Sequence, residues 1–80
     1  MLRCKTITIK IETEANITYS ENIAHGLNIN KIIAFFICSV VGSNSTSEIS
    51  FCNMVNRETV RIVSARNQDV TVTMAYIYSI

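Results

Sequence analysis

The sequence contains no proline, no tryptophan, only two glycines and few charged residues. Charged side chains make up 16% of the chain, against roughly a quarter in typical globular proteins, and the net charge is only +1. This balance argues against a strongly basic nucleic-acid-binding protein. Without proline, no candidate strand is barred from the interior of a sheet. Gly26 and Gly42 form no G-x-G or G-x-x-x-x-G-K motif, which excludes a phosphate-binding loop of that kind.

Metal-binding spacings and long apolar runs are also missing. The three cysteines, Cys4, Cys38 and Cys52, include no C-x-x-C pair, so we expect reduced thiols, no zinc site and no cofactor. The most apolar run, 32–41, is about half the roughly 20 residues that a bilayer requires, and the N-terminus does not have the apolar segment of a signal peptide. We therefore expect a cytoplasmic protein that does not cross a membrane.

The chain is rich in β-branched residues: thirteen isoleucines, seven valines and eight threonines, together 28 of 80. Ile7, Ile9 and Ile11 alternate with polar residues, which predicts a half-buried strand over 5–12. Three further strands are expected over 47–52, 58–65 and 70–79. Their connectors, 53–57 and 66–69, are short and polar, as in β-hairpins.

Residues 20–41 carry the signals of one helix, or of two short helices separated at 26–30. Thr18 and Glu21 match the capping-box pattern, and apolar residues of 33–41 follow helical spacing, with weak helix formers at 26–30. A buried strand over 32–41 is the competing interpretation, because its β-branched residues suit a strand equally well. The favoured prediction is a single α+β domain over 1–80. It is a two-layer sandwich of order β-α-β-β-β, with one helical segment packed on a mostly antiparallel four-stranded sheet.

Two segments, 32–41 and 70–80, are apolar and uncharged. Surfaces of this kind are usually buried against another part of the chain or against a second protein. We therefore expect a small non-enzymatic interaction module that binds a protein partner or self-associates as a homo-oligomer. Its interface would combine the apolar helix with the C-terminal strand. The interface residues expected from this pattern are Phe35, Met74, Tyr76 and Tyr78.

Two other function classes stay open. If the first strand and the 58–65 strand adjoin, Lys10, Arg57 and Arg61 could form a basic face that contacts the phosphates of a nucleic acid. An enzyme would have to use His25, the only histidine, together with a neighbouring cysteine or carboxylate. The acidic residues lie at expected element ends, so no catalytic carboxylate pair is indicated.

Overall fold

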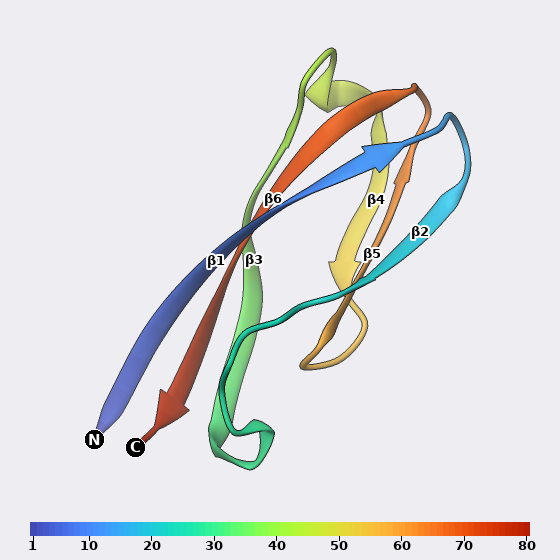
Figure 1. Ribbon diagram of the computed structural model, residues 1–80. Coiled ribbons are helices and arrows are strands. Elements are labelled where there is room, and N and C mark those ends of the chain that lie inside the picture. Colours follow the sequence, from blue (N-terminus) through green and yellow to red (C-terminus); the bar gives the residue numbers. More distant parts are fainter.

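The computed structural model describes all 80 residues and contains six strands and two short 3-10 turns, with no α-helix (Figure 1). No segment therefore forms a helix long and apolar enough to cross a bilayer. In chain order the elements are β1 (Leu2–Thr13), β2 (Thr18–Asn22), η1 (Ile29–Lys31), β3 (Ile32–Gly42), η2 (Thr46–Glu48), β4 (Ile49–Met54), β5 (Thr59–Ser64) and β6 (Gln68–Ser79).

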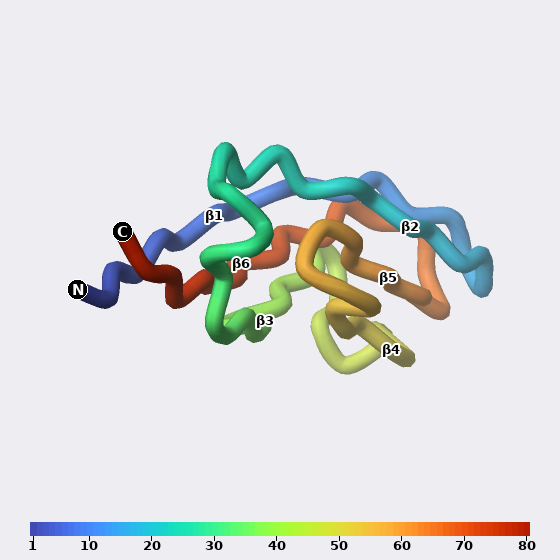
Figure 2. The backbone as a smooth tube through the Cα atoms, turned by 90° about the horizontal axis from the view of Figure 1, so that it is seen from below, coloured from blue at the N-terminus to red at the C-terminus, as the bar shows by residue number.

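The strands form two antiparallel sheets of three strands each. We call β1-β6-β3 the long sheet, because its strands have 11 or 12 residues, and β2-β5-β4 the short sheet, whose strands have five or six. The molecule measures 41 × 16 × 16 Å. Because its strands have about half as many residues, the short sheet covers only part of the long sheet. Residues 23–31 run from β2 to the start of β3 beyond the end of the short sheet, as the tube in Figure 2 shows.

The central strand of each sheet sets which residues face inward. In the long sheet, β6 pairs with β1 and β3, and its inward side chains Val70, Val72, Met74 and Tyr76 are completely buried. In the short sheet, β5 lies between β2 and β4 and contributes buried Val60 and Ile62. The absence of proline allows both strands to donate to two ladders at once.

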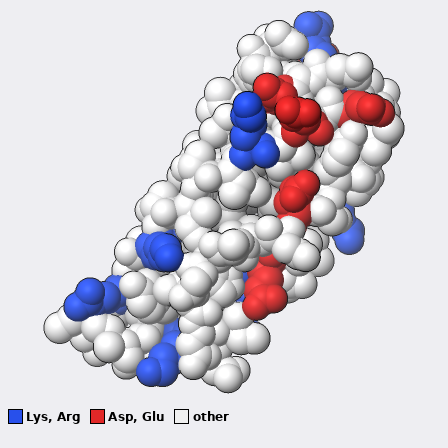
Figure 3. Space-filling view, in the orientation of Figure 1, with Lys and Arg blue, Asp and Glu red and all other residues white.

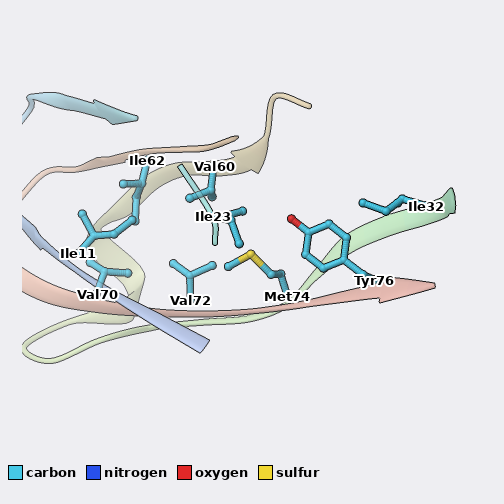
Figure 4. Close-up of a cluster of buried hydrophobic side chains, with 9 residues drawn as sticks. All are labelled: Ile11, Ile23, Ile32, Val60, Ile62, Val70, Val72, Met74 and Tyr76. Atoms are coloured by element: carbon cyan, nitrogen blue, oxygen red, sulfur yellow. The ribbon is translucent and has the colours of Figure 1, made fainter. Parts of the chain in front are cut away.

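The hydrophobic core lies between the two sheets and continues under the 23–31 segment. Figure 4 shows side chains from the long sheet, the short sheet and this segment meeting in one cluster. Fully burying one such aliphatic or aromatic side chain stabilises the fold by about 1.5–3 kcal/mol. The cluster consists of Ile11, Ile23, Ile32, Val60, Ile62, Val70, Val72, Met74 and Tyr76.

The predicted α+β fold is wrong, because no helix spans 20–41 and the strands do not form one four-stranded sheet. Thr18, the predicted helix cap, instead pairs with Val63 in β2–β5, and Gly26 adopts a positive φ of 70° in the connecting segment. Residues 32–42 form a strand, as the competing interpretation states, but it is a partly exposed edge strand and not a buried one. The four predicted strands are present as β1, β4, β5 and β6, but they belong to two different sheets.

Local chemistry explains why the helix does not form between 23 and 31. The ring atom Nδ1 of His25 accepts a hydrogen bond from the Leu27 amide at 2.9 Å, and Asn28 Oδ1 accepts one from the Asn30 amide at 3.0 Å. Such short side-chain bonds satisfy amides that a helix would otherwise use. From Ile32 onward the ladder to β6 takes over, and β-branched residues fit its pleated surface. The predicted 66–69 hairpin loop carries the chain from β5 in the short sheet to β6 in the long one.

Candidate functional site

The outward face of the long sheet lies opposite the core. The pairing register of β1, β6 and β3 arranges its side chains in rows of three across the sheet. The rows are Cys4–Ile77–Ala34, Thr6–Ala75–Phe36, Thr8–Thr73–Ser39 and Lys10–Thr71–Val41. The first two of these rows carry no charge, and we call their six residues the outer patch.

Phe36 is the one large aromatic side chain of the outer patch and is 47% exposed. Its cross-strand neighbour Ala75 is only 4% exposed, and Cys4 and Thr6 are exposed on the other side. The patch therefore has a raised Phe36 beside small side chains. The short sheet packs against the opposite face of the long sheet.

The two edges of the long sheet differ sharply in charge. The edge strand β1 contains Arg3, Lys5, Lys10 and Glu12, which is how proteins discourage strand addition, whereas β3 contains no charged residue. The β3 edge is instead interrupted by two bulges, where one residue has no partner on β6. Bulges bend a strand away from further pairing. The outward side chains of β3, more than its backbone edge, are therefore the available contact surface.

A second feature, a pocket of about 470 Å³, lies where the start of β3 meets the loop between β4 and β5. Its size is within the range of about 300–1,000 Å³ that ligand sites occupy. Ile29 and Phe35 form its apolar part. The polar part comes from the loop residues and the first residue of β5: Asn56, Arg57, Glu58 and Thr59.

His25 is buried beside this pocket, with 5% of its surface exposed. Because Nδ1 accepts the Leu27 amide hydrogen, the ring proton must lie on Nε2. Nε2 is buried without a hydrogen-bond partner, and Oε1 of Glu58 lies 3.9 Å away. Buried donors without partners are uncommon, because the lost hydration is not replaced. His25 therefore holds an unused donor toward the pocket residue Glu58.

The ring of Tyr76 packs against the ring of His25. The two ring centroids are 5.1 Å apart, and the Tyr76 hydroxyl donates a hydrogen bond of 2.7 Å to the backbone carbonyl of Arg57. Burial raises the pKa of the Tyr76 phenol, and the negative charge of Glu58 raises it further. The phenol thus stays protonated and fixes the β4–β5 loop onto the long sheet.

The expected interface residues do not lie on one surface. Met74 and Tyr76 are completely buried within the single chain, so they offer no surface to a partner. Phe35 is half-buried and lines the pocket, 6.5 Å from the Tyr76 ring between centroids. Tyr78 is partly exposed and pairs with Arg3 and Ile32 on the inward side of the long sheet.

The three basic residues expected to contact nucleic acid are dispersed. Lys10 projects from the outer face of the long sheet and forms an ion pair of 3.8 Å with Asp69. Arg61 is exposed on the short sheet, between the inward residues Val60 and Ile62, and therefore points away from the long sheet. Arg57 lies at the pocket. Figure 3 shows the cations as separate spots on one face of the molecule.

His25 does lie beside a carboxylate, as the enzyme hypothesis requires, but no cysteine or serine is hydrogen-bonded to its ring. Cys4 and Cys38 are free and exposed, and burial raises the pKa of the Cys52 thiol, which makes a thiolate at that position less accessible. No group of three or more metal-binding side chains is gathered in the structure.

Sequence reasoning missed Phe36, Ile77 and Glu58. In a strand over 70–79, alternation puts Ala75 and Ile77 on the opposite face from Tyr76, and that signal marks the outer patch once β6 is known to be central. Nothing local marks Glu58, because its neighbours His25 and Tyr76 are distant in the sequence. The chain matches no family model, and comparison with curated proteins and with solved structures finds no significant match.

Proposed function

We propose that the protein is a small interaction module that self-associates, with the outer patch of one copy packed on the outer patch of a second. The observation that carries this proposal is the uncharged, uncovered patch around Phe36 and Ile77 on β3 and β6. These strands contain the two apolar segments expected to need a cover. The contact residues are the outward ones of each strand, in place of Phe35, Met74 and Tyr76.

The shape of the outer patch favours a second copy as its partner. In a twofold pair the same surface meets itself, so raised and recessed parts must complement each other. Phe36 of one copy can lie over the small side chains Ala34 and Ala75 of the other. A charged partner would find no opposite charge in the first two rows.

The size of the outer patch sets the expected strength of association. Three strands about 4.8 Å apart and two rows along them cover an area roughly 15 Å on a side. This is well below the roughly 800 Å² per partner of a stable protein interface. We therefore expect a weak, concentration-dependent dimer and not a permanent one.

Sedimentation equilibrium from micromolar to millimolar concentration tests the proposal. Wild-type protein should shift toward the dimer mass as concentration rises. Phe36→Lys should remove the shift, because each new ammonium would be buried without a partner against the uncharged outer patch of the other copy. The matched control is Phe51→Lys, which changes a 40% exposed phenylalanine of β4 in the short sheet and should leave the dimer intact. A monomer at every concentration, or equal loss in both variants, would overturn the proposal.

A further inference from the structure

We propose that the pocket between Phe35 and the β4–β5 loop binds a small molecule carrying both an ammonium and a carboxylate, namely an α-amino acid with an apolar side chain. This inference is independent of self-association, because the pocket lies on the inward side of β3 and the outer patch on the other. The pocket combines an apolar wall with one cation and one anion.

The side chains of Arg57 and Glu58 form no hydrogen bond within the chain, although Oε1 of Glu58 lies 3.9 Å from Nε2 of His25. The side chains of Arg57 and Glu58 are consecutive and exposed, yet they form no ion pair of 4 Å or less with each other. Elsewhere the protein does pair such groups: Arg66 donates two hydrogen bonds, of 3.0 and 3.1 Å, to the carboxylate of Glu48. A free guanidinium is suited to bind a carboxylate, and a free carboxylate is suited to bind an ammonium.

His25 supplies the second, independent observation. Its buried Nε2–H has no acceptor, and Oε1 of Glu58 lies 3.9 Å away. A carboxylate has two oxygens and several acceptor positions, so Glu58 can accept from Nε2–H and from a ligand ammonium together. This arrangement would satisfy the buried donor and orient Glu58 toward the ammonium.

The remaining lining residues indicate how the ligand would be oriented. Asn56 uses its side-chain oxygen to accept the Glu58 amide hydrogen at 2.8 Å, which leaves its NH2 group free to assist Arg57 in holding a carboxylate. Phe35 and Ile29 provide the apolar contact for the ligand side chain. Aromatic rings pack well against Phe35 in offset or edge-to-face geometry, so an aromatic amino acid is the best probe.

The test is a proton–nitrogen NMR titration with L-phenylalanine, compared with phenethylamine, which lacks the carboxylate, and 3-phenylpropanoate, which lacks the ammonium. L-phenylalanine should cause saturable shifts in the amides of residues 56–59 and of Phe35. Each of the other two probes should bind at least about tenfold more weakly, because each loses a charge-assisted bond.

Two variants and two controls complete the experiment. Arg57→Gln and Glu58→Gln should each weaken L-phenylalanine binding by at least about tenfold, while Arg61→Gln and Glu21→Gln, exposed charges outside the pocket, should not. The titration is repeated in the Phe36→Lys background, so its result does not depend on dimer formation. No saturable shift with L-phenylalanine, or equal binding of all three probes, would overturn the inference.

Discussion

The hydroxyl of Tyr76 offers a direct test of which face of β6 is inward. In Tyr76→Phe the ring stays in the core, but the carbonyl of Arg57 loses its 2.7 Å hydrogen bond in a partly buried position. Leaving such an acceptor unsatisfied costs about 1–3 kcal/mol. Against a total stability of about 4–12 kcal/mol for a chain of this length, this is a large fraction.

We expect a loss of about 1.5 kcal/mol, which corresponds to a fall in Tm of roughly 6–12 °C for a domain of this size. The matched control is Tyr78→Phe, because the hydroxyl of Tyr78 forms no hydrogen bond within the chain and its ring is partly exposed. Thermal unfolding followed by circular dichroism measures both variants. Equal losses, or a larger loss in Tyr78→Phe, would refute the placement of Tyr76 against the β4–β5 loop.

Three other predictions follow from the packing and the titrating groups. Gly42→Ala should lower the free energy of unfolding, measured in urea, by about 1–3 kcal/mol, because a Cβ there would lie 2.6 Å from Oε1 of Gln68. The amides of Asn44 and Ser45 hold that oxygen in place, and an unchanged urea midpoint would contradict this. With a thiol reagent at neutral pH, Cys4 and Cys38 should react fast and Cys52 at least about tenfold more slowly, since Cys52 is partly buried with a raised pKa; three equal rates would contradict its position. The raised pKa of Tyr76 means that the folded state holds this proton more tightly than the unfolded state, so stability is complete below pH 10.0 and falls as pH rises through the folded-state pKa; alkaline unfolding of Tyr76→Phe should lack this part of the decline.

The regular alternation of Ile7, Ile9 and Ile11 predicts β1 correctly, because that strand pairs with β6 over twelve residues without a bulge. The same reasoning fails for β3. Its two bulge residues, Ile33 and Cys38, change the spacing of the inward side chains from two to alternating three and two. The residues that follow helical spacing, Ile33, Phe36, Ile37, Val40 and Val41, are one bulge residue, two outward residues and two inward residues. Both faces of β3 are apolar, so the helical spacing arises without a helix.

The candidate sites could be predicted only in part. The apolar, uncharged segments 32–41 and 70–80 lie side by side as β3 and β6, and their role as an interaction surface stays a prediction. Which of their side chains point outward depends on β6 being central, a long-range property that local pattern does not contain. The pocket depends on contacts between His25, Glu58 and Tyr76, and therefore on how two sheets and the connecting segment pack.

Contact between two copies through the outward face of β3 and β6 can be observed by isotope-filtered NOE spectroscopy on a mixture of labelled and unlabelled chains. We expect cross-chain NOEs from the ring of Phe36 to side-chain protons of the outer patch, including the methyl groups of Ala34 and Ile77. The absence of cross-chain NOEs at millimolar concentration would contradict it. So would NOEs confined to other surfaces, such as Phe51 of the short sheet.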